Sequence, residues 1–253
     1  MQLNYKEFGQ GQPIIILHGL FGMLDNWQTI AKKLAEDYSV YILDQRNHGR
    51  SPHADEHDYT CMAEDLRIFM EDHWIYKAHI MGHSMGGKTA MQFALDFPDM
   101  VDKLIVVDIS PKAYPGGHHQ IFEALLSLDL NKIKNRKQAD AHLAKTISDP
   151  AIRLFLMKNL TRDKKGGYKL KMNLPVIFKH YKDILAPIDS TGTFDGPALF
   201  IRGGNSKHME DGDEVLIKKM FPAAVIKTVK GAGHWVHAEA PAELLSLVKN
   251  FLR

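Results

Sequence analysis

The chain has 253 residues, of which 45% are hydrophobic and 25% charged, and 32 Lys and Arg against 30 Asp and Glu give a net charge of +2. This composition excludes disordered and collagen-like proteins. A disulfide-stapled protein is excluded as well, because the one cysteine, Cys61, cannot form an intramolecular bridge. The small net charge gives no reason to expect a nucleic-acid partner. Residues 1–10 lack the basic and apolar regions of a secretion signal, and no apolar run is long enough for a membrane span. We therefore expect a cytoplasmic protein with no membrane partner.

Short apolar runs alternate along the chain with segments in which apolar residues return every three or four positions, and these predict strands and helices respectively. The predicted strands are 13–17, 40–43, 78–81, 104–107, 198–201 and 225–229, with an antiparallel edge strand at 3–8. The predicted helices are 26–36, 59–73, 85–97, 210–220 and 241–252. Strands that are apolar on both faces are typical of a parallel sheet covered by helices on both sides. The sequence thus predicts an α/β fold with a doubly wound, mostly parallel sheet.

One connection is too long for this alternation. About ninety residues separate the predicted strand that ends near Asp108 from the one that starts at Ala198, whereas such connections are usually short. Within it, 119–130, 137–147 and 150–160 have helical patterns, and Gly166-Gly167 predicts a turn. We therefore predict a mostly helical cap at 111–190, inserted over one end of a core formed by 1–110 and 191–253.

A candidate nucleophile follows the predicted strand 78–81. The sequence there is Gly82-His83-Ser84-Met85-Gly86-Gly87, which matches G-x-S-x-G between a strand and a helix. Small neighbours allow the sharp, strained turn that lifts the Ser84 hydroxyl clear of the sheet. The alternative, a glycine-rich turn that only packs a helix, does not require a serine here. A serine in place of aspartate also disfavours the alkyl-enzyme chemistry of dehalogenases.

An acyl-transfer serine needs two backbone donors directed at the oxyanion. The first is predicted to be Met85, the residue after Ser84. The second should lie in His18-Gly19-Leu20-Phe21-Gly22, directly after the predicted strand 13–17. We favour Leu20 over Phe21, and we expect His18 to fix this loop by hydrogen bonding.

The candidate base is His234, in Gly231-Ala232-Gly233-His234 after the last predicted strand, where the glycines allow the loop to reach Ser84. His237 is the competitor, but a capping or surface role is expected for it. His118-His119 and the stretch 53–58, which is expected to be a solvated loop, lack the spacing of a metal site. No metal and no other cofactor is predicted.

The candidate acid should fall between Ser84 and His234 in the chain. After the predicted strand 198–201 there is no carboxylate until Glu210 and Asp211, whereas Asp108 directly follows the strand 104–107. That strand should lie beside the nucleophile strand. We predict Asp108 as the acid, with Asp211 as the alternative, and Ser206 as a candidate supporting residue.

Together these motifs resemble those of the α/β-hydrolase superfamily, and within it a branch of small bacterial esterases and thioesterases. The matching segments are HGLFG at 18–22, DQRNHGRS at 44–51, GHSMGG at 82–87, VVDISP at 106–111, GGNS at 203–206 and GAGHWVHAE at 231–239. The resemblance implies a serine hydrolase with a helical cap after the sixth strand, acting on short-to-medium acyl esters and acyl-CoA thioesters. It also implies Ser84, Asp108 and His234 as the triad, with Ser206 as a fourth member.

Two alternatives remain open at this point. Related hydrolases cleave carbon–carbon or amide bonds with the same triad, and a protein of this fold can also be a ligand-binding receptor. The complete set of Ser, His, Asp and glycines favours an enzyme with a small-molecule acyl substrate. The sequence does not predict an oligomeric state.

The charge is unevenly distributed. Residues 111–190 hold 15 Lys and Arg against 7 Asp and Glu, a net charge of +8, and the remainder holds 17 against 23, a net charge of −6. Solvated helix faces explain such an excess. We also consider the hypothesis that a basic cap attracts an anionic acyl donor such as a CoA thioester.

Overall fold

In the computed structural model, which describes residues 1–164 and 166–253, seven strands form one sheet in the order β1-β3-β2-β4-β5-β8-β9. β1 pairs antiparallel with β3, and all other neighbours are parallel. The strands are β1 (Tyr5–Phe8), β2 (Pro13–Leu17), β3 (Ser39–Leu43), β4 (Ala78–His83), β5 (Val101–Val107), β8 (Ala198–Gly203) and β9 (Ala224–Val229). The predicted α/β fold and its antiparallel edge strand are confirmed.

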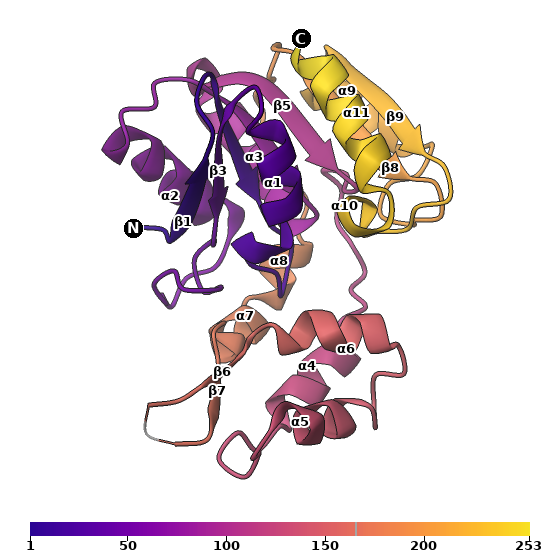
Figure 1. Cartoon of the computed structure of the whole chain (residues 1–253). Helices are drawn as coiled ribbons and strands as arrows, with labels where there is room; N and C mark the ends of the chain where they lie inside the picture. The colour runs from indigo at the N-terminus through magenta and orange to yellow at the C-terminus, as the bar shows by residue number, and fades with distance from the viewer. Residues whose placement is uncertain (165) are drawn as a thin grey trace.

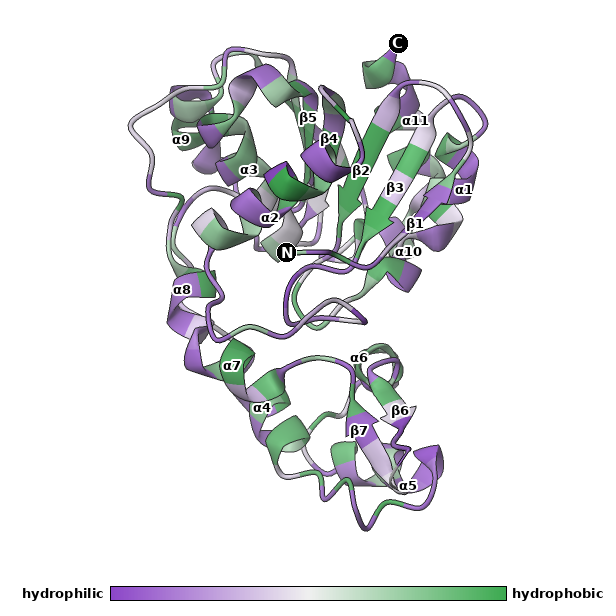
Figure 2. Cartoon of the chain, turned by 90° about the vertical axis from the view of Figure 1, so that its left-hand side faces the viewer, coloured by the Kyte–Doolittle hydropathy of each residue, from purple (hydrophilic) through white to green (hydrophobic). Residues whose placement is uncertain are grey.

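Helices cover both faces of the sheet (Figure 1). They are α1 (Gln28–Leu34) and α11 (Pro241–Leu252) on one face, and α2 (Tyr59–Asp72), α3 (Met85–Asp96) and α9 (Asp213–Met220) on the other. Side chains of β2 alternate between the two faces, with Ile14 and Ile16 packed toward α1 and Ile15 and Leu17 toward α2 and α3. Figure 2 shows the resulting hydrophobic strands β2 and β3 in the interior. Three short helices, η1 (Leu24–Asn26), η2 (Pro98–Met100) and α10 (Val236–Glu239), complete the core.

The long connection between β5 and β8 forms a separate layer below the core in Figure 1. It contains α4 (His119–Leu126), α5 (Arg136–Leu143), α6 (Pro150–Met157), β6 (Leu160–Arg162), β7 (Tyr168–Leu170), α7 (Leu174–Lys179) and α8 (Tyr181–Leu185). Five strands precede this layer, one fewer than the resemblance implies. The hairpin β6–β7, with Gly166-Gly167 in its loop, was not predicted, because its strands are only three residues long.

One buried lysine of the core forms hydrogen bonds with both of the segments that connect the core to the cap. Lys88, on α3, is 1% exposed, and its Nζ donates to the carbonyl oxygens of Lys112 (2.8 Å) and Ala186 (2.5 Å). These residues lie where the chain enters and leaves the cap. Burial lowers the pKa of Lys88 to about 7. The helix that begins beside Ser84 therefore also fixes the position of the cap.

Among the residues that the structure describes, no helix is long and apolar enough to cross a membrane.

Candidate active site

Ser84 occupies the turn between β4 and α3 with a strained backbone. Its φ of 53° and ψ of −122° lie in a region that costs a non-glycine residue about 1–3 kcal/mol. The turn closes only because its neighbours lack side chains: a Cβ on Gly82 would lie 2.1 Å from the Gly86 carbonyl oxygen, and one on Gly86 would lie 2.5 Å from that of Leu17. The G-x-S-x-G sequence is therefore what this turn requires.

Ser84, His234 and Asp108, predicted as a triad, lie in one chain of hydrogen bonds. His234 Nε2 is 3.1 Å from Ser84 Oγ, and His234 Nδ1 is 2.7 Å from Asp108 Oδ2. Asp108 is within reach because β5 pairs with β4, which places the ends of the two strands side by side. Such an arrangement can pass a proton from a serine hydroxyl to an imidazole.

The Asp108 carboxylate is buried and accepts three hydrogen bonds. Gly203 N–H donates to Oδ1 at 2.8 Å, and Oδ2 accepts from the Ser206 hydroxyl and from His234 Nδ1. Burial raises the pKa of Asp108, and the hydrogen bonds from Ser206 and Gly203 oppose this rise. Burial, followed by neighbouring imidazoles, lowers the pKa of His234 well below its usual value. These surroundings favour the neutral form of His234, the form that can accept a proton.

The two alternative candidates, Asp211 and His237, lie outside this chain of hydrogen bonds. Asp211 has a side chain that is 94% exposed and paired with the Arg202 guanidinium. The His237 ring stacks on Trp27 with centroids 4.5 Å apart, so the expected capping or surface role is wrong. His237 lies on α10 with a buried Nδ1, and its partner Trp27 is far away in the chain, so no local pattern predicts this contact.

The predicted oxyanion loop lies against the nucleophile. A Cβ on Gly19 would be 3.2 Å from Ser84 Cβ, and Leu20 and Phe21 line the same cavity as Ser84. His18 fixes the loop: its Nε2 accepts from Gln45 N–H at 3.0 Å, and its Nδ1 lies 2.8 Å from the Gly19 carbonyl oxygen. Leu20 and Met85 remain the predicted donors.

Asp108, His208 and His234 form a group whose ligand atoms lie within 4.8 Å of one another, close enough to hold a metal. However, Asp108 already accepts three hydrogen bonds, and the rings of His208 and His234 stack face to face. These contacts fit an acid–base site, and the predicted absence of metal stays a prediction. The stretch 53–58 is not wholly solvated as expected, because His57 is fully buried and Asp58 caps α2 by accepting from Cys61 N–H at 2.8 Å.

A cavity of about 740 Å³ opens above Ser84 and His234. Its walls are largely apolar and come from both the core and the cap. The apolar cap and loop residues that line it include Ile121, Ile152, Leu154, Phe155 and Trp235. Among the described lining residues, Lys158 is the one lysine, and no arginine or carboxylate accompanies it. Most of the cap's positive charge therefore lies away from the cavity.

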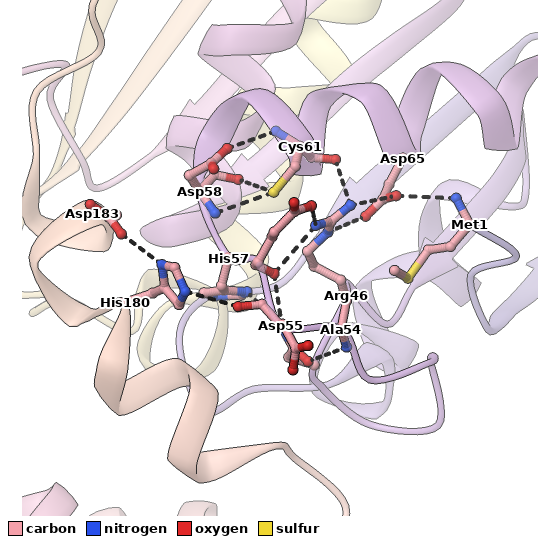
Figure 3. A network of polar contacts seen from close by, with 12 residues as sticks. Met1, Arg46, Ala54, Asp55, His57, Asp58, Cys61, Asp65, His180 and Asp183 are labelled. Carbon is pink, nitrogen blue, oxygen red and sulfur yellow. Dashed lines mark hydrogen bonds and ion pairs between the residues drawn. The ribbon is translucent and has the colours of Figure 1, made fainter.

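The loop 44–58 seals the cap against the core. Asn173 N–H donates to the Asn47 carbonyl oxygen at 2.8 Å, and His180 Nε2 lies 2.9 Å from that of Asp55. Figure 3 shows how this loop is held in turn by Arg46, whose guanidinium pairs with Asp65 at 2.6 Å. Three histidines are buried here: His48 and His57 belong to the loop, and the His18 ring lies 5.1 Å from that of His48.

Acid should destabilise the protein through these three histidines. Burial lowers the pKa of His18 to about 4, of His48 to about 3 and of His57 to about 2. Below pH 6.5 the unfolded chain binds protons that the folded chain does not, so the free energy of unfolding falls as pH decreases. Each such histidine contributes a slope of up to about 1.4 kcal/mol per pH unit. Urea unfolding at several pH values between 7 and 5 measures this slope of the free energy of unfolding against pH.

A substitution separates these histidines from the other titrating groups. His48→Asn keeps a donor for the Arg46 carbonyl oxygen. It should reduce the slope of the free energy of unfolding against pH by the contribution of one histidine, up to about 1.4 kcal/mol per pH unit. His119→Asn, at an exposed position, is the matched control. An unchanged slope in His48→Asn would contradict the assignment of the acid sensitivity to buried imidazoles.

Comparison with known proteins agrees with this geometry. The family model for the alpha/beta hydrolase fold matches residues 12–241. The chain belongs to this family. It is 35% identical to Esterase YbfF of Escherichia coli, with 100% of this chain and 99% of that protein covered. It is 37% identical to the sn-1-specific diacylglycerol lipase ABHD11 of Mus musculus, with 94% and 80% covered.

A solved structure of a marine microorganism esterase superimposes with a TM-score of 0.97 at 43% identity and covers 99% of both chains. This α/β hydrolase therefore has esterases and lipases as relatives over nearly its full length.

Proposed function

We propose that this α/β hydrolase cleaves carboxylic esters through an acyl-enzyme on Ser84. The observation that carries the proposal is the hydrogen-bonded chain Ser84–His234–Asp108 at the base of a largely apolar cavity. An apolar cavity suits an acyl chain, and a neutral, buried imidazole suits the role of general base. The esterase and lipase names of its relatives support the same reaction class.

In the proposed mechanism, His234 Nε2 takes the Ser84 proton as Oγ attacks the ester carbonyl carbon. The Leu20 and Met85 amides stabilise the oxyanion, and Asp108 stabilises the imidazolium. Collapse of the tetrahedral intermediate breaks the bond to the alcohol oxygen, and His234 gives its proton to that oxygen. The alcohol departs and Ser84 is left acylated. Water, deprotonated by His234, then attacks the acyl carbon and releases the acid and free Ser84.

The test of this proposal is pre-steady-state kinetics with a p-nitrophenyl ester. An acyl-enzyme predicts a burst of p-nitrophenol that approaches one equivalent per protein when deacylation is slower than acylation. It also predicts that a serine-reactive phosphonate labels Ser84 and abolishes the burst. Turnover of amides in preference to esters, or ligand binding without turnover, would replace this function by one of the alternatives.

We extend the proposal to acyl-CoA thioesters, whose leaving group is anionic. Lys158 lines the cavity and is exposed, so its ammonium can attract such a group. Lys158→Glu should lower kcat/KM for butyryl-CoA by about fivefold and leave kcat/KM for p-nitrophenyl butyrate within about twofold. The difference should shrink as salt screens the charges.

Lys145→Glu is the matched control, because Lys145 is an exposed cap lysine that does not line the cavity. If both variants lower the acyl-CoA rate equally, the overall cap charge acts and Lys158 has no special role. If neither does, the thioester extension is wrong while ester hydrolysis stands.

A further inference from the structure

The loop that follows β8 reaches the catalytic candidates with two side chains, although it provides no carboxylate. The Ser206 hydroxyl donates to Asp108 Oδ2. Two residues later, the His208 ring lies on the His234 ring, with centroids 3.6 Å apart and planes inclined by 19°. One short loop therefore contacts both the acid and the base.

The backbone of His208 is fixed from two sides, so the stacked position does not depend on the side-chain rotamer alone. His208 N–H donates to Ser206 Oγ at 3.1 Å. The His208 carbonyl oxygen accepts from the Tyr114 hydroxyl, which itself accepts from Ser110 N–H at 2.8 Å. Tyr114 lies on the connection from β5 into the cap. The position of His208 is thus tied to both the acid loop and the cap.

Stacking restrains the plane of the His234 ring, which its two hydrogen bonds do not. Those bonds act at the edges of the imidazole, through Nδ1 and Nε2, and do not by themselves hold its plane; the His83 ring, 4.7 Å away, is tilted against it by 41°. A ring at 3.6 Å covers one face. A flat aromatic ring packed in this way restrains the tilt of the imidazole and keeps water from that face.

We propose that His208 is a positioning residue of this active site, whose ring holds the plane of the His234 imidazole between Ser84 and Asp108 and shields one face of it from water. The proposal rests on the proposed function, because it assigns a role around the same base. His208 touches His234 and is not among the residues that line the cavity, so it acts through the base.

Burial favours the neutral form of His208. Burial is the main cause that lowers the pKa of His208; His118 and Lys112 act in the same direction, and Asp108 opposes them. Tyr114 packs beside the ring at 5.9 Å. A neutral ring can stay stacked when His234 takes up a proton, whereas a protonated one would repel it.

Three substitutions test the proposal: His208→Ala removes the ring, His208→Leu fills the space without an aromatic face, and His208→Phe restores that face. We expect His208→Ala and His208→Leu to lower kcat for p-nitrophenyl butyrate by about tenfold with little change in KM. His208→Phe should retain kcat within about threefold of the wild type. Burst amplitude normalises each rate to the active fraction, and His142→Ala, a cap histidine away from the site, is the control.

The pH profile provides a readout that a merely structural role would not move. Without the ring, water reaches His234, its pKa rises, and the acid limb of kcat/KM should shift upward by about half to one pH unit in His208→Ala but not in His208→Phe. If His208→Leu is as active as His208→Phe, or if His208→Ala keeps the wild-type kcat and pH limb, the proposal is overturned. Failure of the proposed function itself would show separately, as a wild-type protein with no burst.

Discussion

Ser84→Ala is expected to lower kcat for p-nitrophenyl butyrate by at least about 10⁴-fold. The substitution removes the atom that forms the acyl bond, and nothing else among the described side chains lies at hydrogen-bonding distance from His234 Nε2 in its place. The fold should survive, because alanine keeps the Cβ and the same strained turn. The measurement is kcat and burst amplitude, with the thermal midpoint recorded beside them.

Ser110→Ala is the matched control for this loss. Ser110 is buried, and its hydroxyl has no hydrogen-bond partner among the described residues. Its removal should leave kcat within about twofold, because no catalytic contact is lost. A Ser84→Ala protein that keeps more than about a hundredth of wild-type turnover would assign the nucleophile to another residue.

Asp108→Asn should lower kcat by about 10³- to 10⁴-fold, because an amide can neither fix the His234 tautomer nor stabilise the imidazolium as a carboxylate does. Asparagine tolerates the positive φ of 52° at this position better than most residues, so the backbone should be retained. KM should change much less than kcat. Circular dichroism and the thermal midpoint check that the variant is folded.

Asp211→Asn separates the two carboxylates that the sequence left open. Asp211 is exposed and bonded to Arg202, so its substitution should change kcat by less than about twofold. A large loss in Asp211→Asn together with an active Asp108→Asn would reverse the assignment and imply that the 2.7 Å contact between His234 and Asp108 has no role in turnover.

Much of the core was predictable because its signals are local. The strands β2, β4 and β5 are rich in apolar residues, and the turn at Ser84 is specified by glycines whose absent side chains make room for neighbouring backbone. The cap was predictable as an excess of chain length between β5 and β8. Inside it, α7 and α8 and the hairpin β6–β7 were missed, because elements of three to six residues are too short to show a period.

The histidines mark the limit of sequence reasoning. There are fourteen, and spacing from a strand and a pair of glycines was enough to select His234. No local sequence pattern distinguishes His208, which stacks on His234, or His57, which is buried although it lies in a loop of polar residues. Their positions depend on contacts with residues far away in the chain, such as Tyr114 for His208.

The sequence by itself determined the sheet, the Ser84 turn and the loop that carries His234, since these depend on apolar periodicity and on glycines at fixed offsets. Only the tertiary structure shows that Asp108, and not Asp211, contacts the His234 imidazole, because both follow strands and strand order determines which carboxylate reaches that ring. It also showed that the cap's excess of positive charge is represented at the cavity by Lys158 alone among the described lining residues. Net charge can be counted along a chain, but whether a charge faces a substrate depends on how the helices that carry it are packed.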